Sequence, residues 1–224
     1  MTNIMTFSGW GMAHDALANV TPEGSHHVDY SNFTSAQELF KSLKGQSPDV
    51  LVGWSLGGQL ALRAISDGIL APKKLILLAT PYQFVANKEV KCAMDKDTFS
   101  IFVRDLGRAP EMTLKRFITL ISLNDANAYD IITKLKQTTS MENSKKWFYW
   151  LEELENFSCN SIDFSIIPTT YAIHGRDDTI VDSTQTGLFK SLIADLHLEI
   201  FDHCGHAPHL HDEARVKAII QSAL

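Results

Sequence analysis

The sequence predicts an α/β protein in which a mostly parallel β-sheet is covered by helices on both faces. Two regions, residues 5–80 and 166–224, alternate short apolar strand patterns with helical patterns, and a purely helical stretch separates them. Strands that alternate with helices pair in parallel, because each helix carries the chain back across the sheet. The chain has 224 residues. A chain of this size buries about three quarters of its unfolded surface, enough for one core.

The elements follow in order along the chain. A first strand is expected at residues 5–8 and leads to a glycine loop. A second, at residues 27–30, leads to a helix over residues 35–43. A third strand at residues 50–52 precedes another helix, and a fourth follows at residues 74–79. A β-rich run from residue 166 breaks at Gly175, a helix is expected over about residues 183–194, and a last strand over 196–201. No internal repeat interrupts this order.

The motif G-x-S-x-G at residues 53–57 lies between an apolar strand pattern and an amphipathic helix pattern. This context predicts a nucleophile elbow, a sharp strand-to-helix turn that lifts Ser55 clear of its neighbours. Glycines are needed at Gly53 and Gly57 because a Cβ there would collide with the turned backbone. The alternative is a serine in an ordinary glycine-rich loop.

A serine hydroxyl is a poor nucleophile by itself and needs a histidine base and a carboxylate that orients the histidine. Asp177 and Asp178 directly follow the strand that breaks at Gly175, and His206 lies 28 residues after Asp178, because 206 − 178 = 28. That interval accommodates one helix and one strand. The order Ser, Asp, His is typical of one large class of hydrolases, and the residue pattern leaves either aspartate as the acid.

These motifs resemble those of the α/β-hydrolases, and more narrowly those of the pimeloyl-[acyl-carrier protein] methyl ester esterases of biotin synthesis. The matching segments are Gly9-Trp10-Gly11, residues 53–58, the pattern Gly175-x-x-Asp178-x-Ile180-Val181, the triplet His206-Ala207-Pro208, and residues 113–120. The resemblance extends over nearly the whole chain. It implies an α/β-hydrolase fold.

The resemblance also implies roles for individual residues. It makes Ser55 the nucleophile, Asp178 the orienting acid and His206 the base. Asp178 keeps the spacing to Ile180 and Val181, which favours it over Asp177. The backbone N–H groups of Trp10 and Leu56 would form the oxyanion hole, and Phe117 would contact the substrate.

The activity implied by the resemblance is that of a serine carboxylesterase acting on pimeloyl-[acyl-carrier protein] methyl ester. The reaction would proceed by acyl transfer to water through an acyl-enzyme. Two alternatives remain open. One is a thioesterase or another α/β-hydrolase acting on a small acyl substrate, and the other is a non-catalytic α/β-hydrolase scaffold that binds a ligand or a partner.

The stretch between the two strand-rich regions predicts a helical lid over about residues 81–161, inserted into a single domain (residues 1–224) whose core is residues 1–80 and 162–224. The lid would enclose the acyl part of the substrate. The aromatic residues Trp147 and Trp150 either line that space or pack the lid onto the sheet. Arg116 and the neighbouring lysines of the lid either contact a carrier protein or form an ordinary solvated helix face.

Composition excludes several other classes of function. The net charge of −6 argues against a nucleic-acid partner, and no apolar run approaches the roughly 20 residues that cross a bilayer. Three cysteines without framework spacing, and an N-terminus without a basic and then apolar leader, suggest a cytoplasmic enzyme. The histidines at positions 203–211 lack the companions of a known metal motif, so neither a metal nor another cofactor is expected.

Overall fold

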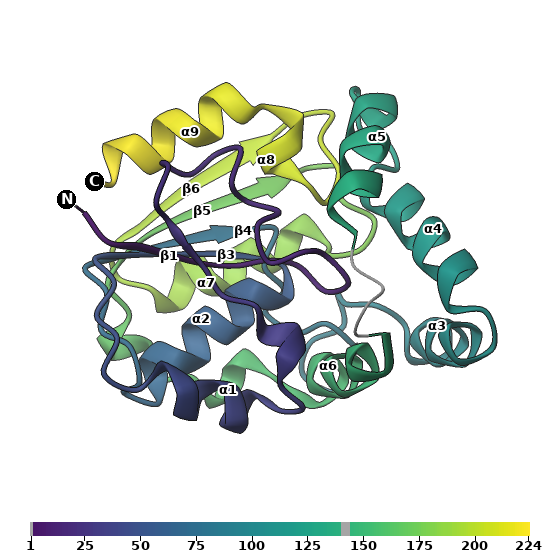
Figure 1. Cartoon of the computed structure of the whole chain (residues 1–224), viewed down its shortest axis with the longest axis horizontal. Coiled ribbons are helices and arrows are strands. Elements are labelled where there is room, and N and C mark those ends of the chain that lie inside the picture. Colours follow the sequence, from purple (N-terminus) through teal and green to yellow (C-terminus); the bar gives the residue numbers. More distant parts are fainter. Residues whose placement is uncertain (1, 140–143) are drawn as a thin grey trace.

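A six-stranded parallel sheet forms the centre of the protein, whose computed structural model describes residues 2–139 and 144–224 (Figure 1). Every neighbouring pair of strands is parallel, in the order β2-β1-β3-β4-β5-β6. The strands are β1 (Ile4–Phe7), β2 (His26–His27), β3 (Val50–Trp54), β4 (Lys74–Leu78), β5 (Thr169–Gly175) and β6 (Leu196–Phe201). The predicted α/β fold with a parallel sheet is confirmed.

Helices cover both faces of this sheet. In Figure 1, α1 (Ala36–Leu43) and α2 (Leu56–Ser66) lie on one face, and α9 (Glu213–Ser222) lies on the other. The remaining core helices are α7 (Thr186–Leu192) and α8 (Pro208–His211). All five residues of β3 are buried, as expected for a strand with helices above and below it.

Several observed boundaries differ from those expected. The strand expected at residues 27–30 is only His26–His27, and a 3₁₀ turn follows at Tyr30–Asn32, where the Asp29 carboxylate accepts the Ser31 N–H. A short carboxylate that binds the local backbone in this way favours a turn over a strand. β5 begins only after Pro168, which has no N–H to donate to a ladder. The helix expected over 183–194 is a 3₁₀ turn, Ser183–Gln185, followed by α7.

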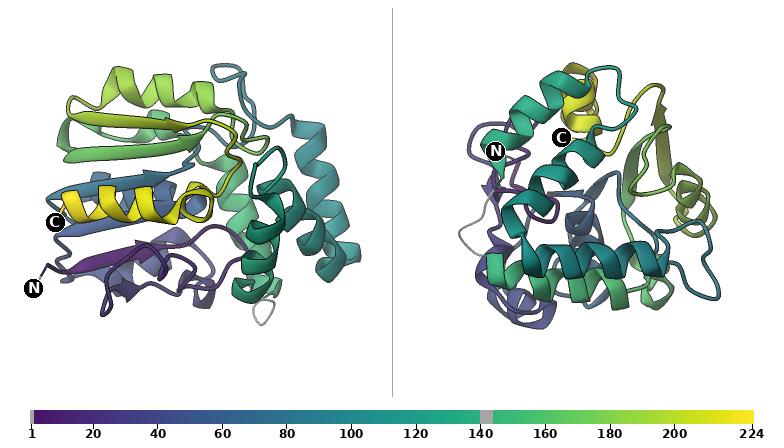
Figure 2. Two further views of the ribbon diagram at one scale, coloured as in Figure 1. Left: turned by 90° about the horizontal axis from the view of Figure 1, so that it is seen from above. Right: turned by 90° about the vertical axis from the view of Figure 1, so that its right-hand side faces the viewer.

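Four helices between β4 and β5 lie beyond the carboxyl ends of the strands, and we call them the lid (Figures 1 and 2). They are α3 (Lys96–Arg108), α4 (Pro110–Ile121), α5 (Ala128–Thr138) and α6 (Ser144–Asn156). Trp147 and Trp150 of α6 are buried and meet the ring of Tyr30 edge-on, with centroid distances of 5.8 and 4.9 Å. These two tryptophans therefore pack the lid against the core.

Two further 3₁₀ turns, Cys159–Ser161 and Phe164–Ile166, connect α6 to β5.

Within residues 2–139 and 144–224, no helix has both the length and the apolar character needed to cross a membrane.

Candidate active site

The turn between β3 and α2 presents Ser55 in a strained conformation. Its backbone has φ 55° and ψ −121°, which is rare for a residue with a side chain. A Cβ on Gly53 would lie 2.5 Å from the Cα of Gly58, and one on Gly57 would lie 2.2 Å from the carbonyl oxygen of Phe7. Only glycine fits at these two positions, so the turn has the local geometry that the motif predicted.

Ser55, His206 and Asp178 are joined by two hydrogen bonds, although they come from three distant parts of the chain. His206 Nε2 lies 2.9 Å from Ser55 Oγ, and His206 Nδ1 lies 2.7 Å from Asp178 Oδ2. All three residues are buried. If Nδ1 carries the proton and donates it to the carboxylate, Nε2 is free to accept the proton of the serine hydroxyl. Asp177 is only half-buried, and its backbone N–H bonds to the carbonyl of Cys204.

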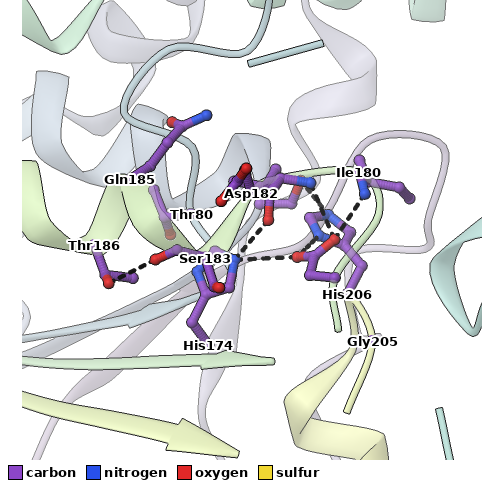
Figure 3. Close-up of polar contacts among 12 residues, drawn as sticks. Thr80, His174, Ile180, Asp182, Ser183, Gln185, Thr186, Gly205 and His206 are labelled. Carbon is purple, nitrogen blue, oxygen red and sulfur yellow. Dashed lines mark hydrogen bonds and ion pairs between the residues drawn. The ribbon is translucent and has the colours of Figure 1, made fainter. Parts of the chain in front are cut away.

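The Asp178 carboxylate is held by donors on both of its oxygens. Oδ1 accepts the backbone N–H groups of Ile180 and Val181 at 2.8 and 3.0 Å. His174 Nε2 lies 3.2 Å from Oδ2 and 2.9 Å from the Val181 carbonyl oxygen. Figure 3 shows the labelled residues His174, Ile180 and His206 of this region, with their hydrogen bonds as dashed lines.

These contacts also determine the protonation state of the Asp178 carboxyl. Burial by itself would raise the pKa of the Asp178 carboxyl, but the charge of His206 and the hydrogen bonds from His174 and His206 outweigh it and hold the pKa well below its usual range. The group is therefore a carboxylate at neutral pH. Sequence reasoning missed His174. Its signal was a polar side chain in an apolar strand, one position before Gly175.

Two backbone N–H groups near the elbow remain available for a substrate oxygen. Leu56 opens α2, so its N–H is one of the first-turn donors that have no partner within a helix. Within the described residues, neither this N–H nor that of Trp10 donates to an acceptor. The indole Nε1–H of Trp10 instead donates to the carbonyl of Trp147 in the lid, at 2.9 Å.

A mostly apolar pocket of about 210 Å³ lies between the core and the lid, and Ser55 is part of its lining. Trp10 and Phe117 also line it, with their rings edge-to-face at a centroid distance of 5.4 Å. Its charged lining residues are Asp105 and Arg116, and 67% of the Arg116 side chain is exposed. Trp147 and Trp150 are not lining residues.

The histidines at the end of the sequence do not gather around one point. His206 belongs to the chain of hydrogen bonds above, whereas His209 is fully buried against the Trp54 ring at a centroid distance of 4.4 Å. Neither ring nitrogen of His209 has a hydrogen-bond partner in the part of the chain that the structure describes. Burial, followed by the charges of His206 and Lys134, lowers the pKa of His209 to about 3. His209 is therefore neutral in the folded protein.

Comparisons with a family profile and with known sequences place the chain in one family. Residues 4–219 match the profile described as "Alpha/beta hydrolase family". The chain is 31% identical over 199 residues to the biotin biosynthesis bifunctional protein BioHC of Teredinibacter turnerae, covering 84% of this chain and 35% of that protein. It is 28% identical to the pimeloyl-[acyl-carrier protein] methyl ester esterase of Nitrosospira multiformis, covering 73% of this chain and 64% of that protein. The corresponding esterase of Nitrosomonas europaea is 24% identical, with 93% and 90% covered.

Solved structures share the fold. An esterase from Exiguobacterium antarcticum superposes with a TM-score of 0.78 at 14% identity, covering 99% of this chain and 91% of that one. A bromoperoxidase from Bacillus anthracis gives a TM-score of 0.74, also at 14% identity, with 100% and 92% covered. At these identities the likeness concerns the fold alone.

The buried His209 generates a prediction about stability. Because its pKa is about 3 in the folded state and about 6.5 when unfolded, only the unfolded chain takes up this proton between those pH values. Folding should therefore lose free energy as the pH falls from 6.5 towards 3. His209→Phe, which keeps a ring against Trp54, should raise the melting temperature, and more at pH 5 than at pH 7.5. Calorimetric scans at the two pH values measure this. An equal shift at both would contradict the neutral buried imidazole.

Proposed function

Because the chain belongs to the alpha/beta hydrolase family, we propose that it is a serine carboxylesterase. One observation carries the proposal: a buried, hydrogen-bonded line from Asp178 through His206 to the strained Ser55, which lines an apolar pocket. A hydroxyl, an imidazole and a carboxylate in this arrangement supply a nucleophile, a base and an orienting acid.

In the proposed reaction, Ser55 Oγ attacks the ester carbonyl while His206 Nε2 takes the hydroxyl proton. The N–H groups of Trp10 and Leu56 donate to the oxyanion that forms. His206 then gives the proton to the departing alcohol. Water, deprotonated by the same imidazole, then attacks the acyl-enzyme. His206 returns this proton to Ser55 Oγ as the carboxylic acid leaves, and Asp178 keeps His206 in one orientation throughout.

We propose that the substrate is a pimeloyl-[acyl-carrier protein] methyl ester. Relatives named for this activity match the chain over most of its length. An apolar pocket under the lid suits an acyl chain, and Phe117 would contact that chain within it. Arg116 is exposed on α4 at the same pocket, where a cation would meet the phosphate or an acidic helix of a carrier protein. The net charge of −6 makes such a local cation necessary, because the whole protein does not attract an acidic partner.

The nucleophile is tested by Ser55→Ala. Hydrolysis of p-nitrophenyl butyrate should fall by about a thousandfold or more, because no other side chain can take over the attack. Circular dichroism should show an unchanged fold. The control is Ser191→Ala, an exposed serine of α7, which should retain full activity. Substantial esterase activity in purified Ser55→Ala would refute the serine mechanism.

The acid is tested by comparing Asp178→Asn with Asp177→Asn. An amide at position 178 would favour the wrong histidine tautomer, so kcat should fall by roughly 10³- to 10⁴-fold. The neighbouring substitution should change kcat less than twofold, an order-of-magnitude expectation for a half-exposed turn residue. Steady-state kinetics on one ester distinguish the two variants. The opposite ranking would transfer the role to Asp177.

Contact with a carrier protein is tested by Arg116→Ala on two substrates. KM for an acyl-carrier-protein ester should rise, and the loss should diminish at high salt because rim charges are screened. The kcat/KM value for p-nitrophenyl butyrate should stay nearly the same. Lys190→Ala, which removes an exposed cation from α7, is the matched control. Equal losses on both substrates would show that Arg116 supports the packing of the lid, and no loss on either would leave it a solvated charge.

A further inference from the structure

The loop that carries His206 is bonded to the turn between α4 and α5 of the lid. His206 N–H donates to the Ile121 carbonyl at 2.9 Å, and Ala126 N–H donates to the His203 carbonyl, also at 2.9 Å. A Cβ on Gly205 would lie 2.7 Å from the Ile121 carbonyl oxygen, so the two backbones are in direct contact there. The position of the proposed base therefore depends on a lid segment that lies much earlier in the chain. Asp125 of this segment and Gly205 are 80 residues apart in the sequence.

Asp125, in this lid turn, supplies a buried carboxylate to the same contact. Its side chain has no exposed surface. Oδ2 accepts the N–H of Gly205 at 2.8 Å, and Oδ1 accepts the N–H of Asn127 at 2.7 Å. His211 Nδ1 lies 2.9 Å from Oδ1, and the Asn127 side chain donates to the His211 carbonyl at 3.0 Å. One carboxylate thus joins the lid turn to both ends of the segment 205–211.

We propose that Asp125 is a positioning residue for His206. This proposal rests on the serine-esterase function proposed above. Asp125 acts through Gly205, the residue directly before the base, and does not touch the reacting atoms. A buried N–H that loses its acceptor costs free energy, so without the carboxylate the loop would move to recover a partner. A displacement of about 1 Å in a catalytic group can reduce a rate by roughly a hundredfold.

The alternative for this cluster is a metal site, because ligand atoms of Asp125, Cys204 and His211 all lie within 4.8 Å of one another. Two features argue against it. The carboxylate already accepts N–H donors on both oxygens. Burial, followed by the charges of Asp125 and Asp178, raises the pKa of the Cys204 thiol, whereas a metal requires the thiolate. The hydrogen-bonded anchor therefore accounts for the cluster better than an ion does.

The test compares Asp125→Asn and Asp125→Ala with a control that only destabilises the fold. Leu43→Ala removes a buried side chain of α1, and it is assayed, like the others, well below its own melting temperature. Both Asp125 variants should lower kcat for p-nitrophenyl butyrate by roughly 10- to 100-fold, alanine more than asparagine, with KM within about twofold. Inactivation by a fluorophosphonate, which reports the reactivity of Ser55, should slow by the same factor. Leu43→Ala should change neither rate.

Hydrogen exchange separates this proposal from the esterase assignment, because it does not depend on the reaction. The amides of Gly205 and His206 should exchange faster in both Asp125 variants relative to other core amides of the same protein, whereas Leu43→Ala should not single out these two amides. Unchanged exchange, or a kcat within twofold of wild type in folded Asp125→Asn, would overturn the positioning role. A zinc-dependent gain of activity that Asp125→Asn abolishes would replace it with a metal site. Faster exchange in a protein without any esterase activity would leave the anchor intact and refute the esterase function instead.

Discussion

The close approach of backbone segments at the elbow is the constraint on which the rest of the site depends. Gly57 packs against the carbonyl of Phe7 at the end of β1, and Ser55 N–H bonds to the Leu78 carbonyl at the end of β4, at 2.9 Å. The serine is thereby fixed between the strands on either side of its own. The loop after β1 begins beside it, which brings the Trp10 N–H to the same edge of the sheet. A larger residue at Gly57 would push the elbow away from the end of β1, and so move the proposed nucleophile Ser55 away from the proposed oxyanion donor Trp10.

Besides bounding the pocket, the lid contacts two parts of the proposed site. On one side, the Trp10 indole donates to the Trp147 carbonyl and packs edge-to-face against Phe117, so the lid contacts the loop that carries the proposed oxyanion donor. On the other side, the lid turn accepts the backbone N–H of His206. Motion of the lid would therefore alter the geometry of the proposed catalytic residues as well as access to the pocket.

The parts of the proposed site that could be predicted from the sequence are those encoded by short motifs. The elbow residues and the pair Asp177-Asp178 can be predicted from a few neighbouring positions, since glycine spacing and the end of a strand are local features. The choice of Asp178 over Asp177 needed the resemblance to a known family. His174 and Asp125 could not be assigned in this way. Asp125 meets Gly205 across 80 residues of sequence, and nothing in either neighbourhood indicates the other. The strand expected at residues 27–30 is present but ends at His27, because the Asp29 side chain binds the local backbone and favours a turn.

Two buried carboxylates, Asp178 and Asp125, flank the loop that carries His206. Both are stabilised inside the core by hydrogen-bond donors. The side chains of Asp178 and Asp125 are both fully buried, and each accepts two backbone N–H groups. Asp178 also has two histidine partners, whereas Asp125 has one. These donors replace the water that each charge loses on burial, and they fix the direction in which it points. Asp178 points at the ring of His206, whereas Asp125 points at the backbone beside it. Asp178 can orient the imidazole ring of His206, the proposed base, and Asp125 can position the backbone that carries this ring. The two carboxylates therefore constrain different degrees of freedom of the same residue.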